Sequence, residues 1–200
     1  MLDEFYRYII TDSPSDYPGA TFHWAPFTGY FGSHYDVVQT ENHRRWKIEG
    51  QIRKINVKSR TLYEPYPRIH IIQGIQVFME NGETEAFGMD LHDTVRVDSL
   101  EVPVGEHIKE FVVRSGNYID AIGFKTNKGK SFGLIGGNGG SLKHSSHLWA
   151  MRASDHYYVD GIQGLTVVTQ DAPCICEIQF KYVIVPPIAP SSSKFNPKRR

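Results

Sequence analysis

The sequence lacks the features that mark several large classes of protein. No stretch approaches the ~20 consecutive apolar residues that a membrane-spanning helix requires. Neither sign of charge predominates, because 22 lysines and arginines balance 22 aspartates and glutamates. A neutral chain has no overall field that would attract nucleic acid or an anionic membrane, and its one charged run, Lys198–Arg200, is typical of a solvated tail. We therefore expect no nucleic-acid partner and no insertion into a membrane.

Cysteine is equally scarce. The two cysteines, Cys174 and Cys176, are too few to ligate a structural zinc ion, and a disulfide across one residue is strained. In an extended strand both side chains would point to the same face. We expect two free thiols on a strand, with an intermolecular bridge as the alternative if the protein lies outside the cell.

The length and the first residues of the chain leave its location open. Two hundred residues fit one medium domain and are short for two. The N-terminus does not contain the basic start and apolar segment of a signal peptide. The protein is then either cytoplasmic or secreted with a leader missing from this sequence, and the residues do not decide between these.

Signatures of nucleotide binding and catalysis are incomplete. Gly123 and Gly129 are separated by five residues where a P-loop needs four, and Leu142 stands at the third glycine position of G-x-G-x-x-G. His144 and His147 form H-x-x-H, but no helix and no nearby acidic partner supports a metal site. No spacing of serine, histidine and acid, and no pair of acids, argues for hydrolysis. We expect no enzymatic activity, no cofactor and no metal.

Aromatic and β-branched residues dominate the sequence, and helical periodicity is nearly absent. Turn signals such as Asn81-Gly82 and Ser115-Gly116 separate short apolar runs, which is typical of an all-β sandwich, barrel or prism. The predicted strands are Ile52–Val57, Ile69–Met79, His107–Val113, Ile119–Thr126, Gly164–Thr169 and Ile175–Val185.

Three segments repeat one plan, a strand, a turn and a second strand that carries I-x-x-I. They cover residues 52–88, 108–133 and 162–185. The first has a longer insertion, TLYEPYP, between its strands, and the third has no closing turn. Three such units predict a pseudo-threefold arrangement, with one small sheet per unit and apolar faces that meet along a central axis.

The second repeat contains the sharpest local feature. Gly116–Asp120 reads GNYID, and Gly136–Gly140 reads GGNGG, a loop almost without side chains whose backbone N–H groups can approach a ligand closely. Strand alternation predicts that Ile119 points inward while Tyr118 and Asp120 share the exposed face. A carboxylate that accepts hydroxyl protons, a flat aromatic ring and bare N–H donors suit a saccharide.

The surrounding residues then resemble a known family. Residues 105–140 contain a flanking Gly-Glu, an R-S-G turn, a T-N-x-G hairpin and a Phe-Gly before the glycine loop. This segment closely resembles the repeat of the jacalin-related lectins, particularly the mannose-binding members, and a weaker likeness extends over roughly 27–185. The resemblance implies a β-prism I fold of three Greek-key-like sheets over 27–185, between an N-terminal arm, 1–26, and a flexible C-terminal tail, 186–200.

The resemblance also implies roles for individual residues. Asp120 would accept hydrogen bonds from two sugar hydroxyls, the N–H groups of Asn117 and Tyr118 would donate to sugar oxygens, and the Tyr118 ring would pack on the sugar. Gly140, and with it Gly139, would donate from the loop. The residues implied to bind carbohydrate are Gly116, Asn117, Tyr118, Asp120, Gly139 and Gly140.

The other two repeats depart from the family pattern. In the first repeat Gln73 replaces the aspartate, and no glycine loop follows. In the third, Cys176 replaces the aspartate and Ala172 the first glycine, while the loop near the start of the chain keeps only Gly29 and Gly32. One intact site predicts one saccharide per chain, so avidity would require a homo-oligomer.

Two functions remain at this point. The first is reversible binding of mannose- or glucose-type glycans, or of glycoproteins that carry them, with no bond broken. The second is a structural or protein-interaction module that uses the prism as a scaffold without binding sugar. Asp120 discriminates between them, because only the first function requires its carboxylate.

Overall fold

The computed structural model describes residues 21–24, 43–63, 68–90, 97–145, 157–169 and 172–184. All regular structure in these segments is β-strand, so they contain no helix that could cross a membrane. The strands are β1 (Thr21–Trp24), β2 (His43–Glu49), β3 (Ile52–Leu62), β4 (Ile69–Met79), β5 (Thr84–Phe87), β6 (Val97–Glu101), β7 (Ile108–Ser115), β8 (Ile119–Thr126), β9 (Ser131–Gly136), β10 (Ser141–His144), β11 (Tyr157–Thr169) and β12 (Ala172–Ile184).

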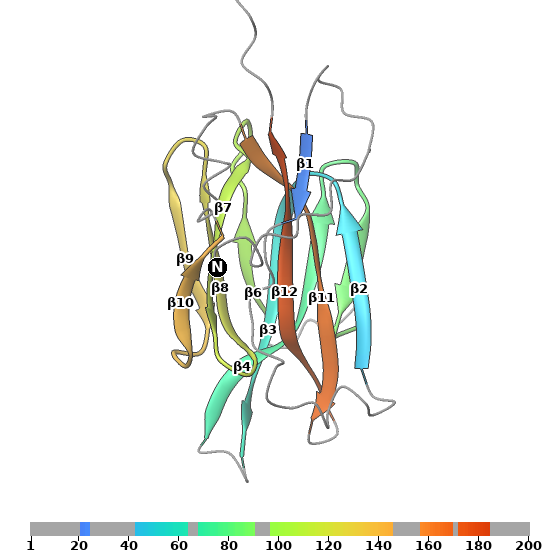
Figure 1. Ribbon diagram of the computed structural model, residues 1–200, viewed down its shortest axis with the longest axis vertical. Coiled ribbons are helices and arrows are strands. Elements are labelled where there is room, and N and C mark those ends of the chain that lie inside the picture. The colour runs from blue at the N-terminus through green and yellow to red at the C-terminus, as the bar shows by residue number, and fades with distance from the viewer. Residues whose placement is uncertain are drawn as a thin grey trace, which may run out of the picture.

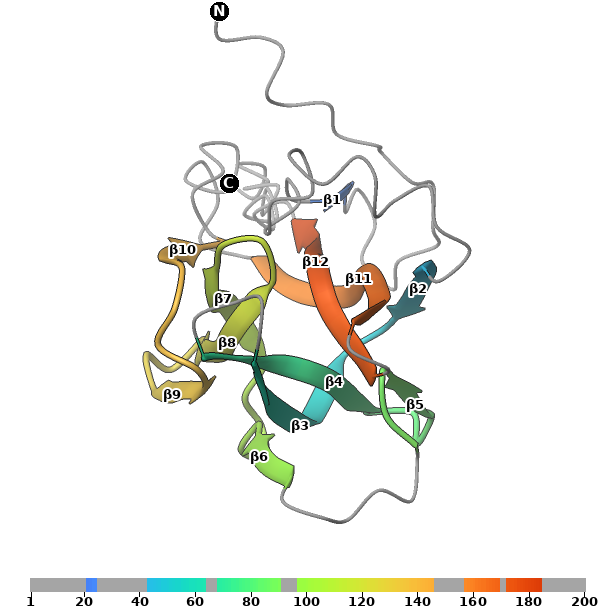
Figure 2. The same ribbon diagram turned by 90° about the horizontal axis from the view of Figure 1, so that it is seen from below.

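The strands form three four-stranded antiparallel sheets around a common axis (Figures 1 and 2). The first sheet has the order β6-β3-β4-β5 and the second β10-β7-β8-β9. In both, the fourth strand of the unit returns to lie beside the first, which is the Greek-key order. The third sheet is β2-β11-β12-β1. The predicted all-β prism with one sheet per repeat is confirmed.

The third sheet is completed by the start of the chain. The third repeat supplies only the hairpin β11–β12, and β1 and β2 take the two outer places. The sequence predicts an arm over 1–26 outside the domain, whereas β1 pairs with β12 from Thr21↔Ile184 to Trp24↔Lys181. Residues 21–24 of that arm therefore belong to the prism as the edge strand of its third sheet.

The apolar faces of the three sheets meet in one core. The Phe111 ring on β7 stacks on Phe180 of β12 with centroids 4.1 Å apart, which joins the second and third sheets. Trp46 of β2 stacks on Phe87 of β5 at 4.2 Å and joins the third sheet to the first. Burying one large apolar side chain contributes about 1.5–3 kcal/mol. The core residues come from all three repeats, so no single unit could bury its apolar face alone.

Each repeat hairpin contains a β-bulge at the same place. The pairing register shifts by one residue so that the ladder skips Gln73 in β4, Asp120 in β8 and Cys176 in β12. These are the three positions that the sequence repeats aligned with one another. A bulge bends its strand and re-aims the side chain at the extra residue. The fold therefore gives one residue per repeat a distinct orientation, and only the second repeat places an acid there.

Beyond the bulge the three hairpins differ. Those of the first and third repeats continue to the pairs Leu62↔Ile69 and Thr169↔Ala172, whereas the second turns directly after Ser115↔Ile119. The first hairpin reaches furthest at the lower end of the molecule in Figure 1. A second apolar cluster, which we call the end cluster, fills this end of the prism. It comprises Leu62, Ile71, Tyr118, Leu165, Val167, Cys174 and Cys176, with Ile69 packed against it.

Both cysteines lie in the end cluster as free thiols on one strand, as predicted. Neither is exposed, and Cys176 Sγ donates to the carbonyl oxygen of Leu165 at 3.3 Å. Burial raises the pKa of the Cys176 thiol, which disfavours the reactive thiolate. We expect no reaction with 5,5′-dithiobis(2-nitrobenzoate) in the folded protein and two thiols per chain in guanidinium chloride. Rapid labelling of the folded chain would contradict this packing.

Candidate functional site

The Gly116–Asp120 turn and the Gly136–Gly140 loop lie side by side in the second sheet. The turn joins β7 to β8 and the loop joins β9 to β10, while the pairing of Ser141 with Ser115 brings the end of the loop against the turn. A Cβ atom added to Gly116 would lie 3.7 Å from the Cα of Gly140. The structure thus brings together both segments that the sequence singled out.

Two loop glycines form a cradle around the Asp120 carboxylate. A Cβ atom on Gly139 would lie 2.6 Å from Asp120 Oδ1, and one on Gly140 would lie 2.5 Å from Oδ2. Gly140 also has φ +60°, a conformation that side chains disfavour. Any larger residue at these positions would displace the carboxylate or the loop. The glycines therefore allow the loop to lie directly against the Asp120 carboxylate.

The Asp120 carboxylate is ionised at neutral pH although its burial disfavours the charged form. Only 5% of the residue is exposed, and burial raises its pKa to about 6. A hydrogen bond from the Gly116 backbone and the positive charge of Arg114 act in the opposite direction but do not cancel the effect. A buried acid kept at a cost in stability, beside bare backbone, is typical of functional sites.

The structure contradicts the predicted exposed face. Tyr118 is only 8% exposed and belongs to the end cluster, where it packs with residues of the first and third hairpins. Ile119 is fully buried as predicted, but Asp120 is buried as well. Strand alternation fails here because the bulge at Asp120 interrupts the period of two. Tyr118 therefore anchors the turn rather than offering a ring to a ligand, and exposed Asn117 takes the outermost place.

The first repeat contributes a wall that sequence reasoning missed. A Cβ atom on Gly137 would lie 2.0 Å from the carbonyl oxygen of His70 and 3.1 Å from its Cβ. The His70 ring is fixed between two hydroxyls, with Nδ1 3.1 Å from Thr61 Oγ1 and Nε2 3.0 Å from Ser59 Oγ. The only sequence signal was the longer insertion in the first repeat, which did not say where the extended hairpin would lie.

Comparison with known proteins identifies the fold. The sequence matches no protein-family model and no curated protein. Among solved structures, a prostate-specific WGA16 glycoprotein lectin is 18% identical with a TM-score of 0.52, over 78% of this chain and 96% of that chain. The mannose-binding jacalin-related lectin AcmJRL from Ananas comosus is 15% identical with a TM-score of 0.52, over 82% and 98%.

This chain has the jacalin-related lectin fold. The same prism occurs inside a longer chain, since PirB matches with a TM-score of 0.52 and 16% identity over 82% of this chain but 38% of its own. At these identities the likeness concerns the fold, so the chemistry must be argued from the residues of this chain.

Within the jacalin-related fold, the other two bulges lack the features of the Asp120 site. A Cβ atom on Gly88, which has φ +76°, would lie 2.5 Å from the carbonyl oxygen of Gln73, as one on Gly136 would lie 2.2 Å from that of Asp120. The first repeat therefore keeps the first glycine of the loop. Gln73 carries no charge, and the fully buried Cys176 bonds to its own sheet. The loop that contains Gly29 and Gly32 lies outside the described residues.

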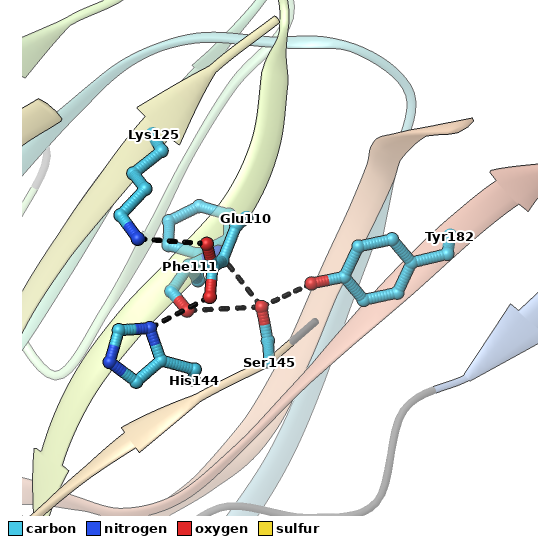
Figure 3. Close-up of polar contacts among 6 residues, drawn as sticks. All are labelled: Glu110, Phe111, Lys125, His144, Ser145 and Tyr182. Atoms are coloured by element: carbon cyan, nitrogen blue, oxygen red, sulfur yellow. Dashed lines mark hydrogen bonds and ion pairs between the residues drawn. The ribbon is translucent and has the colours of Figure 1, made fainter. Parts of the chain in front are cut away.

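A polar network on the second sheet corrects one expectation. His144 does have an acidic partner, because Glu110 Oε1 lies 2.7 Å from its Nδ1, and Lys125 contacts the other carboxylate oxygen at 3.2 Å (Figure 3). The Phe111 N–H donates to Ser145 Oγ at 2.8 Å, and Ser145 also bonds to the Tyr182 hydroxyl. These bonds tie β7, β8, β10 and β12 together.

The described residues around that network do not form a set of metal ligands. No group of three or more potential metal-ligating residues occurs in the described part of the chain, and His147 lies outside it. The nitrogen Nδ1 of His144 is hydrogen-bonded to Glu110. The Ser145 hydroxyl is hydrogen-bonded to the Phe111 carbonyl oxygen and to the Tyr182 hydroxyl. The arrangement is that of a structural link between sheets.

A pocket of about 260 Å³ lies in the third sheet, on strands β2 and β11. Its lining includes two cations, but Arg45 is 3.7 Å from Glu177 and Lys47 is paired with Glu49. Its charges are thus largely neutralised within the sheet, and it contains neither the bulged acid nor a glycine loop. We place the candidate site at Asp120 because the buried carboxylate and the glycine loop lie there and not at this pocket.

Proposed function

We propose that this protein is a lectin that reversibly binds mannose- or glucose-type glycans at one site per chain. The single observation that supports this most strongly is the Asp120 carboxylate, buried, ionised at neutral pH and approached closely by glycine backbone. The proposed binding residues are Gly116, Asn117, Tyr118, Asp120, Gly139 and Gly140.

The bonding follows from what each group can do. The carboxylate accepts hydrogen bonds from two neighbouring sugar hydroxyls, and bonds to a charged group are each worth about 1.5–3 kcal/mol. Backbone N–H groups of Asn117, Tyr118 and Gly140 donate to sugar oxygens. The Tyr118 ring holds the turn from behind. With no apolar ring beneath the sugar the affinity is weak, about millimolar or ~4 kcal/mol, so strong attachment requires a homo-oligomer or a multivalent glycan.

The scaffold alternative has one observation in its favour. Two of the three repeats keep the bulge and its packing without an acid, so the prism itself does not need a sugar site. The same observation argues for a role of Asp120. Glutamine and cysteine occupy the equivalent bulges of the first and third repeats, so folding does not account for the buried carboxylate at the bulge of the second repeat.

A glycan array tests the proposal. The purified protein, displayed multivalently, is expected to retain mannose- or glucose-type glycans at pH 7.5 and to lose them progressively below pH 6, as Asp120 takes up a proton. Asp120→Asn is expected to reduce retention at least 100-fold, to background, because the amide offers one acceptor and no charge.

Asp160→Asn is the matched control. Burial also raises the pKa of Asp160 to about 6, but this residue lies on β11 beside Glu49 and Lys181, away from the glycine loop. It should retain glycans at pH 7.5. Equal retention by wild type and Asp120→Asn, or no retention by a folded wild type, would favour the scaffold function instead.

A further inference from the structure

The dipeptide Asn-Gly occurs twice in this chain, at Asn81-Gly82 and at Asn138-Gly139. Asparagine followed by glycine is chemically labile, because no side chain hinders the approach of the glycine nitrogen to the asparagine amide. The first dipeptide lies in the turn between β4 and β5, and the second lies in the glycine loop of the candidate site, between β9 and β10. Both asparagines are exposed, so the fold around each dipeptide decides how readily it reacts.

The turn at Asn81 holds its dipeptide with two hydrogen bonds. Asn81 Oδ1 accepts from the Glu83 N–H at 2.9 Å, and the Gly82 N–H donates to the Met79 carbonyl oxygen at 3.2 Å. Both bonds must break before the Gly82 nitrogen can reach the Asn81 side chain. Since each such bond contributes about 1 kcal/mol, the pair slows that reaction by roughly tenfold or more.

The loop at Asn138 holds its dipeptide less firmly. The Asn138 carbonyl oxygen lies 3.5 Å from Arg114 Nη1, which is a long contact and involves only the backbone. Among the described residues, no hydrogen bond holds the Asn138 side-chain amide or the Gly139 N–H. Glycine on both sides also leaves the local backbone free to rotate. Asn138 can therefore reach a reactive geometry more readily than Asn81.

We propose that Asn138 is a site of spontaneous deamidation, and that this modification abolishes saccharide binding. The Gly139 nitrogen bonds to Asn138 Cγ, the bond from Cγ to the side-chain nitrogen breaks, and ammonia leaves with the proton of the Gly139 N–H. Water then opens the resulting succinimide at either of its two carbonyl groups. The products are aspartate or isoaspartate at position 138, and no oxidant or reductant is needed. The chemical step stands without the proposed function, whereas the loss of binding rests on it.

Isoaspartate disrupts the loop because the loop is fixed on both sides of the modified residue. A Cβ atom on Gly137 would lie 2.0 Å from a backbone oxygen of the first sheet, and one on Gly140 would lie 2.3 Å from a backbone carbon of β7. Isoaspartate adds one atom to the backbone between these two contacts. The added length displaces Gly139, which lies against the Asp120 carboxylate. Either product also places a negative charge next to Gly139, which disfavours the ionised form of Asp120.

Peptide mass spectrometry of the full chain, after incubation of the folded protein at pH 8 and 37 °C, measures both asparagines in one sample. Labelling by an isoaspartyl methyltransferase reports the isomerised product. Asn138 is expected to deamidate about tenfold faster than Asn81. In guanidinium chloride the two rates should become similar, because both asparagines precede glycine. An unmodified Asn138, or equal or faster reaction at Asn81 in the folded protein, would overturn the modification site.

Retention of a mannose-type glycan before and after the same incubation tests the effect on binding. Retention should fall in proportion to the fraction modified at position 138. Asn138→Gln, whose longer side chain closes a ring less readily, should match fresh wild type and keep its retention, whereas the matched control Asn81→Gln should lose retention as wild type does. Full retention by protein modified at position 138 would overturn the effect on binding. No retention by fresh, folded wild type would overturn the proposed function and this effect, while the mass measurement would still decide the modification site.

Discussion

Asp120→Asn is expected to unfold at a higher temperature than the wild type at pH 7.5. Burial raises the pKa of this carboxyl from 3.8 to about 6 in the folded protein. The folded state therefore binds a proton more readily than the unfolded state, and stability falls as pH rises from about 4 to about 6. A shift of about two units corresponds to up to about 3 kcal/mol, which the neutral amide would recover.

Thermal unfolding at two pH values measures this effect. At pH 7.5 a gain of this size should raise Tm by up to roughly 6–12 °C for a chain of this length, and at pH 3.5 it should nearly vanish because Asp120 is then mostly protonated in both states. Asp98→Asn, at an exposed aspartate on β6, controls for the substitution itself and should leave Tm nearly unchanged at pH 7.5. A large loss of stability in Asp120→Asn would mean that the carboxylate holds the turn together, and would favour the scaffold function.

Gly140→Ala is expected to be strongly destabilising, because the added methyl group has no room in the loop. The new Cβ would lie 2.3 Å from the backbone carbon of Ser115, 2.6 Å from the Gly116 nitrogen and 2.5 Å from Asp120 Oδ2. The φ of +60° alone costs a side chain roughly 1–2 kcal/mol. Because two of these neighbours are backbone, relief requires the loop to move, and we expect a total loss of about 3 kcal/mol or more.

Urea unfolding and glycan binding should both register the change. Displacement of the loop would move Gly140 away from the carboxylate, so glycan retention should be lost even where the variant folds. Gly133→Ala is the matched control, because it lies on β9 with nothing within 4 Å of the added atom, and it should be neutral in both measurements. Normal stability and normal binding in Gly140→Ala would exclude the cradle as described.

The repeats explain how much of this molecule could be predicted. Strands β4 and β8 begin and end where the sequence predicted, because their apolar runs are long and bounded by turn residues. The alignment of Gln73, Asp120 and Cys176 is confirmed by the three bulges. The outer strands of the three sheets were not predicted; these are β1, β2, β5, β6, β9 and β10. They are short and lie at sheet edges, so their pattern is weak and their partners are distant in sequence.

The candidate site was predictable only in its local parts. The turn and the glycine loop each carry a sequence signature, and their proximity follows from the β7–β10 pairing. The burial of Tyr118 was not predictable, since it depends on a bulge and on hairpins from two other repeats. The contact of His70 with Gly137 joins different repeats, and nothing in either segment alone indicates it.

The most direct measurement is a titration of ¹⁵N-labelled protein with methyl α-mannoside up to tens of millimolar, followed by amide chemical shifts. We predict saturable shifts at Asn117, Tyr118, Gly139 and Gly140, with Gly133 on the neighbouring strand as an unmoved reference. Shifts that cluster instead around Arg45, Lys47 and Gln163 at the pocket of the third sheet, or no shifts at all, would contradict a saccharide site at Asp120.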